Sequence, residues 1–324
     1  MLERFYNCDN FVVYDLEWNQ GFAYSNYRMP HEIIEIGACK TDGRGNINSQ
    51  FSQMIRPVVY RKIDRHIQKV TGITQREIED GDTFEYVYEE FCRWSENAFF
   101  ITWGRDDFPV FKRNIEFFNQ KLKLNAPIDL QLIFGFIQFK DESRQINLHQ
   151  ALDMMKIDSD IPAHRALYDS ISTCLLLPEI VRGLENLTDV ERDHLEKILE
   201  KEKCIAESKV ICLPTRYKHY VEAISDKRVT EFSCPICSKK ISFEIPWFDE
   251  GKEKFSALGN CKEHGKVQGI IHFRRDTRGN LVANKRMIHA IDIQTEAVER
   301  KYALFKSIPE KKRHHRIEMK MEST

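Results

Sequence analysis

The sequence lacks the features that would assign the protein to a membrane, to secretion or to disorder. No apolar run reaches the roughly 18 to 20 residues that a membrane-spanning helix needs. Residues 1–10 lack the apolar stretch of roughly 7 to 15 residues that is typical of a secretion signal. A hydrophobic fraction of 42% is too high for a disordered chain. We therefore expect a folded, cytoplasmic protein that does not enter a membrane.

Net charge is also nearly absent, but the charges are unevenly distributed. The 49 Lys and Arg residues almost balance the 50 Asp and Glu residues. Residues 1–180 hold 20 basic and 27 acidic side chains, whereas residues 181–324 hold 29 and 23. A length of 324 residues corresponds to about two domains. We infer that the two parts of the chain have different roles.

The cysteines do not form the even, regularly spaced set of a secreted disulfide scaffold. There are nine, and six of them are scattered singly, as expected of reduced thiols. The other three are organised with a histidine, because Cys234 and Cys237 form one pair and Cys261 and His264 form a second pair of the same spacing. A single such pair could be a redox motif or chance, but two pairs predict one structural Zn²⁺ held by three thiolates and an imidazole.

Strand-like sequence follows each of these two pairs, at residues 241–245 and 267–273. We therefore predict a small zinc-ribbon-like β module over residues 229–300, followed by a basic tail over residues 301–324. A charged helical linker is expected over residues 184–228.

The C-terminal part is basic, which favours a polyanionic partner. Residues 229–324 hold 19 bases against 13 acids, including the run at residues 311–316 (KKRHHR). Arg274 and Arg275 are candidates for phosphate contact. Zinc ribbons bind nucleic acid or protein, and the cysteine spacing does not choose between these partners.

The N-terminal part reads as a mixed α/β domain over residues 1–183. Residues 11–18 and 32–40 have the alternating, β-branched pattern of strands, and the Gly-rich residues 42–46 predict a hairpin turn into residues 47–56. Helical patterns then alternate with a short buried strand at residues 98–103. We expect a mixed sheet flanked by helices.

Acidic side chains recur at three places in this domain. Asp15 and Glu17 alternate on the first strand, so both project from the same face. Asp107 follows a buried strand and precedes a helix, where it could be an N-cap, a metal ligand or both. His164 lies just before the last helix of the domain and Asp169 lies on it. Each of these residues taken alone would usually be structural.

The combined order resembles that of the DEDDh 3′–5′ exonucleases. These enzymes carry D-x-E on the first strand, an Asp after a later strand, and H-x-x-x-x-D at the last helix. Further phrases are similar to the branch that holds bacterial KapD-like and eukaryotic ERI-type exonucleases: residues 32–38 (EIIEIGA), 71–74 (TGIT), 101–104 (ITWG), 128–130 (IDL) and 164–167 (HRAL). The resemblance covers residues 8–183 and implies a ribonuclease-H-like fold.

The resemblance also implies a catalytic role for Asp15, Glu17, Asp107, His164 and Asp169. Asp15 would bridge two Mg²⁺ or Mn²⁺ ions, Glu17 and Asp169 would complete the site of the nucleophilic water, and Asp107 would support the second ion. His164 would be the general base. Independently of the family, carboxylates that share one cleft cannot all ionise without nearby positive charge, and hard divalent cations prefer oxygen ligands.

The sequence therefore predicts a metal-dependent 3′–5′ exonuclease that trims single-stranded nucleic acid and releases nucleoside 5′-monophosphates. RNA is slightly favoured over DNA, because the resembled branch includes RNA processors. One alternative is a regulatory protein of the KapD type that uses the exonuclease-like fold as a binding surface, with a protein partner at the zinc-ribbon-like module. Another is an oligonucleotidase that degrades very short fragments. Trp18 and Trp103 are either surfaces for base stacking or core residues.

Overall fold

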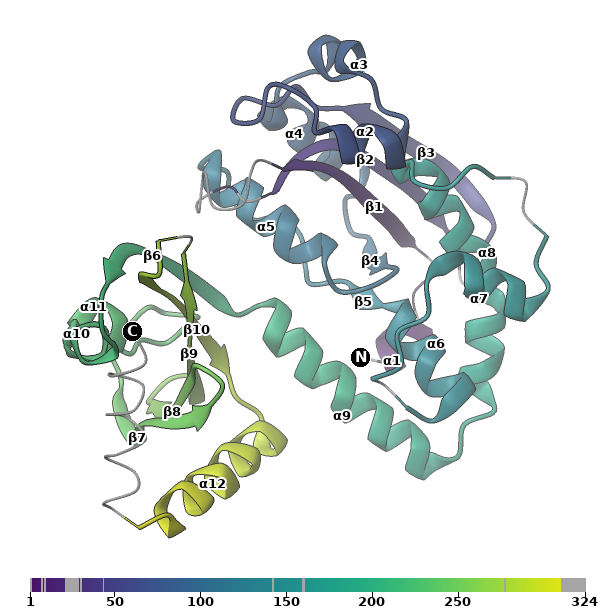
Figure 1. The fold of residues 1–324 in the computed structure, drawn as a ribbon. Helices are drawn as coiled ribbons and strands as arrows, with labels where there is room; N and C mark the ends of the chain where they lie inside the picture. The colour runs from purple at the N-terminus through teal and green to yellow at the C-terminus, as the bar shows by residue number, and fades with distance from the viewer. Residues whose placement is uncertain are drawn as a thin grey trace. The chain divides into compact units, whose positions relative to one another are not determined.

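The computed structural model divides the chain into two compact units, Met1–Lys203 and Cys204–Thr324 (Figure 1). It describes residues 2–6, 8, 10–20, 29, 31–42, 44–141, 143–158, 161–276 and 278–309. The basic run at residues 311–316 lies outside the described residues. Within the described ranges, no helix has both the length and the apolar character to cross a membrane.

The first unit is built on a five-stranded mixed sheet with the order β3-β2-β1-β4-β5. Its strands are β1 (Phe11–Gln20), β2 (His31–Thr41), β3 (Ile47–Met54), β4 (Phe99–Thr102) and β5 (Ile128–Asp129). The pairs β1–β2 and β2–β3 are antiparallel, whereas β1–β4 and β4–β5 are parallel. The predicted hairpin and buried strand are therefore confirmed, as is the ribonuclease-H-like mixed sheet flanked by helices.

Helices cover both faces of this sheet (Figure 1). They are α1 (Leu2–Tyr6), α2 (Arg65–Thr71), α3 (Gln75–Asp80), α4 (Phe84–Trp94), α5 (Asp107–Phe117), α6 (Leu130–Phe139), α7 (Leu148–Met155), α8 (Ala166–Glu185) and α9 (Asp189–Ala206). Because side chains alternate along β1, Phe11 and Val13 join the core formed by α6 to α9. Tyr14 faces the other way, into rings from α4 and α5 that include Phe91 and Phe111.

Residues 184–228, expected to be a charged linker, divide between the two units. Leu195, Ile198 and Leu199 lie on one face of α9 and are buried in the core of the first unit. Their spacing of three and four residues is that of an amphipathic helix, and it is present in the sequence among the charges. The chain then enters β6 (Lys209–Tyr217) and the helices α10 (Tyr220–Ser225) and α11 (Lys227–Thr230) of the second unit.

The second unit is a five-stranded antiparallel sheet with the order β6-β10-β9-β8-β7. Its remaining elements are β7 (Ser242–Gly251), β8 (Lys254–Cys261), β9 (Gly265–Arg275), β10 (Leu281–His289) and α12 (Asp292–Ser307). The strands predicted after each metal-ligand pair are present as parts of β7 and β9. The unit is larger than the module expected over residues 229–300, because β6 precedes that range and α12 continues past it.

Candidate active site and metal centre

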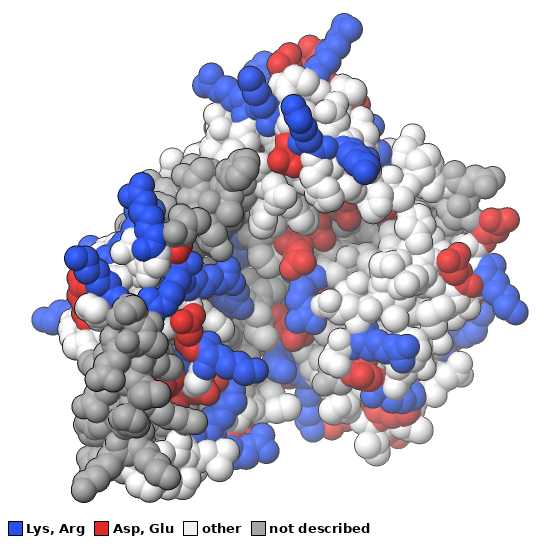
Figure 2. Space-filling model, viewed as in Figure 1, with Lys and Arg blue, Asp and Glu red and all other residues white. Residues whose placement is uncertain are grey.

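Three of the predicted acids meet at the junction of β1 and α8. Asp15 and Glu17 project from one face of β1, and Asp169 lies in the first turn of α8. One carboxylate oxygen from each of the three lies within 4.8 Å of the other two. Figure 2 shows acidic side chains gathered in a recess of the first unit. Residues about 150 positions apart in the sequence therefore share one site.

Asp107 approaches the same strand from α5. Its side chain is buried, and its Oδ1 accepts a hydrogen bond from the backbone N–H of Leu16 at 3.2 Å. This bond places the carboxylate beside β1, between the two acids of that strand. The N-cap position of α5 belongs to the exposed Asp106, which makes no capping hydrogen bond. The interpretation of Asp107 as a helix N-cap is therefore wrong, because Asp107 is the first residue of α5 and its carboxylate accepts a hydrogen bond from β1.

His164 lies just before α8, as predicted. Its backbone adopts a φ of 63°, in the left-handed region that residues other than glycine rarely occupy. Its N–H donates a hydrogen bond to Oδ2 of Asp169 at 3.1 Å, which couples the turn to the acid cluster. His164 is exposed. Burial raises the pKa of Asp169, and the nearby His164 opposes that rise.

A buried carboxylate on β2 positions the start of α8. Glu35 pairs with Glu17 in the β1–β2 register and is only 1% exposed. Its Oε1 accepts from Nη2 of Arg165 at 2.9 Å, and its Oε2 accepts from Nε of Arg165 at 3.1 Å and from the N–H of Ala166 at 3.3 Å. Glu35 thus caps α8 in place of Arg165, whose side chain makes no capping bond.

The roles of Glu35 and Arg165 were not predicted from the sequence. The signal that could have found Glu35 is an ionisable residue in the middle of an otherwise apolar strand, where an unpaired charge would be costly. Its partner could not be identified from the sequence, because 130 positions separate the two residues.

The close approach of α8 to β2 depends on Gly37, which pairs with Asp15 in the strand register. A Cβ atom at this position would lie 1.9 Å from the backbone nitrogen of Leu167. The Ser170 hydroxyl donates a hydrogen bond to the Gly37 carbonyl at 3.0 Å. Only a glycine therefore lets the helix lie near enough to the sheet to bring Asp169 to β1.

The acids oppose one another's ionisation. Burial raises the pKa of Asp15 well above its usual value, and the charges of Asp107, Glu17 and Asp169 raise it further. Burial followed by the charge of Asp169 raises the pKa of Glu17 to about 8. Burial raises the pKa of Asp107 to about 7. A ligand set made only of carboxylate oxygens, which ionises fully only beside positive charge, fits hard divalent cations such as Mg²⁺ or Mn²⁺.

The two tryptophans predicted as possible surfaces for base stacking differ in environment. Trp103 donates its indole N–H to the carbonyl of Ile146 at 3.1 Å and packs against Phe134. Trp18 is half-buried, and its ring centroid lies 5.7 Å from that of His31. Trp103 therefore packs against the core of the first unit.

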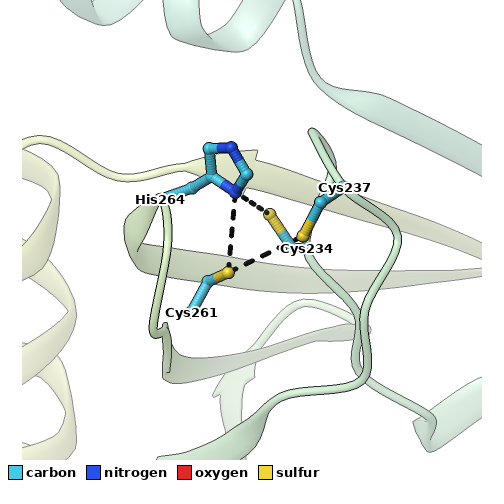
Figure 3. A group of neighbouring side chains, drawn as sticks. All are labelled: Cys234, Cys237, Cys261 and His264. Atoms are coloured by element: carbon cyan, nitrogen blue, oxygen red, sulfur yellow. Dashed lines mark hydrogen bonds between the residues drawn. The ribbon is translucent and has the colours of Figure 1, made fainter.

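The four predicted zinc ligands of the second unit also come together. Cys234 and Cys237 lie on the loop before β7, Cys261 ends β8, and His264 lies in the turn between β8 and β9. Figure 3 shows the four side chains pointing toward one another. Nδ1 of His264 lies 3.7 Å from the sulfurs of Cys234 and Cys261, and the sulfurs of Cys237 and Cys261 are 3.8 Å apart.

These distances match a tetrahedral metal site. Four ligands at the usual Zn–S length of about 2.3 Å would place neighbouring sulfurs about 3.8 Å apart. A sulfur–sulfur separation of 3.8 Å is also far too long for a disulfide. Hydrogen bonds from nearby backbone N–H groups, that of Glu263 first, lower the pKa of Cys261 to about 6, which favours the thiolate that a metal requires.

Known proteins resemble the first unit. The 3′–5′ exonuclease crn-4 of Caenorhabditis elegans is 25% identical over 192 residues, which cover 55% of this chain and 64% of that protein. The probable 3′–5′ exonuclease KapD of Bacillus subtilis is 25% identical over 193 residues, or 58% of this chain and 89% of that protein. The solved nuclease domain of 3′hExo, a DEDDh family member bound to rAMP, has a TM-score of 0.48 and 21% identity over 54% of this chain and 92% of that chain.

The chain thus spans slightly less than two thirds of the worm protein's length. The family model RNase_T, described as Exonuclease, matches residues 12–177. That range makes up half of the chain and contains all five residues of the site described above. The chain therefore belongs to the exonuclease family.

Proposed function

We propose that this protein is a metal-dependent 3′–5′ exonuclease that hydrolyses phosphodiester bonds at the 3′ end of single-stranded nucleic acid and releases nucleoside 5′-monophosphates. The observation that carries the proposal is the convergence of Asp15, Glu17 and Asp169, with Asp107 beside them, in one recess of the first unit. Such a set of oxygen ligands suits two divalent cations. Bound there, Mg²⁺ or Mn²⁺ would activate a water and stabilise the charge on the leaving oxygen.

The residues of this chain would then have distinct tasks. Asp15 would be a ligand common to both ions, because it groups with Glu17 and Asp169 and the charge of Asp107 also acts on it. His164 would accept the proton of the attacking water, because its side chain is exposed and its backbone is hydrogen-bonded to Asp169 of the carboxylate group. Glu35 and Arg165 would hold the turn that carries His164.

RNA is the slightly favoured substrate. A human relative is named ERI1 exoribonuclease 2, and it is 24% identical over 54% of this chain and 28% of its own length. The alternative, a regulatory protein that uses the exonuclease-like fold as a binding surface, has less support. A binding surface would not need buried carboxylates that raise one another's pKa, and this chain retains the whole set.

We further propose that Cys234, Cys237, Cys261 and His264 bind one structural Zn²⁺. Beyond the ligand geometry, the proposal is supported by the burial of Cys234 and Cys261 in a small hydrophobic cluster of the second unit. A cytoplasmic location is supported by the free thiols of the eight cysteines whose side chains are described.

A trimming assay tests the main proposal. Single-stranded RNA and DNA labelled at the 5′ end should shorten stepwise with Mg²⁺ or Mn²⁺, and a 3′-terminal phosphorothioate bond should slow the first step. Asp107→Asn should abolish shortening, whereas the matched control Asp106→Asn should retain it, because only Asp107 reaches β1. Intact RNA and DNA after incubation with either metal would refute the exonuclease and support the regulatory alternative.

A further inference from the structure

One face of the second sheet is partly open. Side chains alternate between the two faces of a strand, and the face that carries Phe255, Ile271 and Phe273 packs against α10 and α11. On the opposite face, α12 packs over the region around Leu258, and Val298 is the buried α12 residue of that contact. The rest of that face contains exposed side chains on β9, the central strand, which include His272 and Arg274. Among the described residues, this part of the face is therefore available for a ligand.

Basic side chains from four strands gather on this open part. Lys254 of β8 pairs with His272 of β9, and His272 pairs with Asn284 of β10. Arg274 lies two residues beyond His272 and Arg286 two residues beyond Asn284, so both share this face. Arg216 of β6 pairs with Val282 in the row of Arg274. We call this set the basic face: Arg216, Lys254, His272, Arg274 and Arg286.

Two acidic groups form ion pairs with members of this set. Glu250 pairs with Lys254 at 3.1 Å and also with Lys301 of α12 at 2.9 Å. Asp276 pairs with Arg216 at 2.8 Å. Burial lowers the pKa of His272, and the positive charges of Lys254, Arg274 and Arg286 lower it further. Three cations therefore lie near enough to His272 to act on its imidazole. Figure 2 shows Lys and Arg side chains gathered over β9 and β10.

We propose that the basic face binds the phosphate backbone of single-stranded nucleic acid, which is the substrate class of the proposed function on which this inference rests. Arg guanidinium groups form two parallel hydrogen bonds with phosphate oxygens. Side chains two residues apart on a strand are about 7 Å apart, so Arg274 and His272 present a row to an extended chain. Backbone contacts carry no base information, so binding is independent of sequence and falls steeply with salt.

The structure supplies a matched control on the same strand. Arg275 follows Arg274 directly, so its side chain leaves the opposite face of the sheet. It pairs with the buried Leu281, and its Nη1 donates a hydrogen bond to the carbonyl of Gly279 at 3.0 Å. Arg274→Glu and Arg275→Glu change the net charge equally. A difference in nucleic-acid affinity between the two variants therefore depends on the face that carries the arginine and not on the net charge of the protein.

Binding is measured by fluorescence anisotropy of labelled single-stranded RNA and DNA 12-mers, with full-length protein carrying Asp15→Asn so that no substrate is consumed. Arg274→Glu should weaken binding about tenfold and lower the slope of log K against log salt by about 0.7 or more, as expected for the loss of one phosphate contact. Arg275→Glu should change binding less than twofold. Circular dichroism and melting curves show whether both variants fold.

Equal effects of the two variants, or unchanged binding with Arg274→Glu, would overturn the inference. Binding of a polyglutamate peptide but not of either 12-mer would also overturn it, in favour of an acidic protein partner. The binding assay uses the Asp15→Asn protein and therefore does not depend on hydrolysis. A failure of the proposed exonuclease activity can thus be distinguished from a failure of this inference.

Discussion

The carboxylate site should make the protein lose stability as the pH rises when no divalent metal is bound. The pKa of Glu17 is raised from 4.5 to about 8 by folding, so its neutral form stabilises the folded state fully below pH 4.5. That contribution is lost as the pH rises through about 8, and at 1.36 kcal/mol per pKa unit it amounts to up to about 5 kcal/mol. Asp107, with a pKa of about 7, acts in the same direction.

Melting curves with and without Mg²⁺ test this reasoning. A change of several kcal/mol in a unit of about 200 residues corresponds to a Tm about 10 °C lower near pH 8.5 than near pH 5.5. Mg²⁺ should restore the Tm at the higher pH by pairing with the ionised acids, and it does not act on the cysteine cluster, because thiolates select softer ions. Asp15→Asn should reduce the pH effect, because it removes a further buried acid whose own pKa is raised.

A Tm that is the same at both pH values without Mg²⁺ would refute the mutual repulsion of the acids. A reduction of the pH effect by Asp106→Asn as large as that by Asp15→Asn would also contradict the reasoning, since Asp106 is exposed and only its charge acts on Asp107.

Three further predictions address the groups around the two sites. Glu35→Gln should remove the ion pair with the partly exposed Arg165, lower the free energy of unfolding by about 1 to 3 kcal/mol, and lower kcat about tenfold with KM within twofold; a loss of stability without a change in kcat would contradict the positioning role. Gly37→Ala should destabilise the first unit by about 3 kcal/mol in urea titrations, because the added Cβ meets the backbone of α8. Cys237→Ser should abolish bound zinc in atomic absorption and unfold the second unit, whereas Cys92→Ser should keep one zinc per chain; one zinc in both would exclude Cys237 as a ligand.

Local patterns in the sequence were sufficient for several features. The alternation of Asp15 and Glu17 places both on one face of a strand, whatever the rest of the chain does. The spacing of Thr74 and Glu77 predicts the capping box that begins α3. Two ligand pairs of equal spacing predicted that Cys234 and His264 would meet, as they do in the structure. In each case the partners lie within a few residues, or the ligand chemistry restricts the choice of partner.

Contacts between distant segments decided the rest. Asp106 and Asp107 are adjacent residues of the same type. The packing of α5 on β1 buries Asp107 and leaves Asp106 exposed. Glu35 acquires its role from Arg165, 130 residues away.

Arg274 and Arg275 were interchangeable as phosphate contacts until the sheet placed them on opposite faces. The sequence by itself determined which side chains could bind metal and on which elements they lie. The tertiary structure decided which neighbours they meet and which are buried, because burial and pairing energies depend on segments that the fold alone brings together.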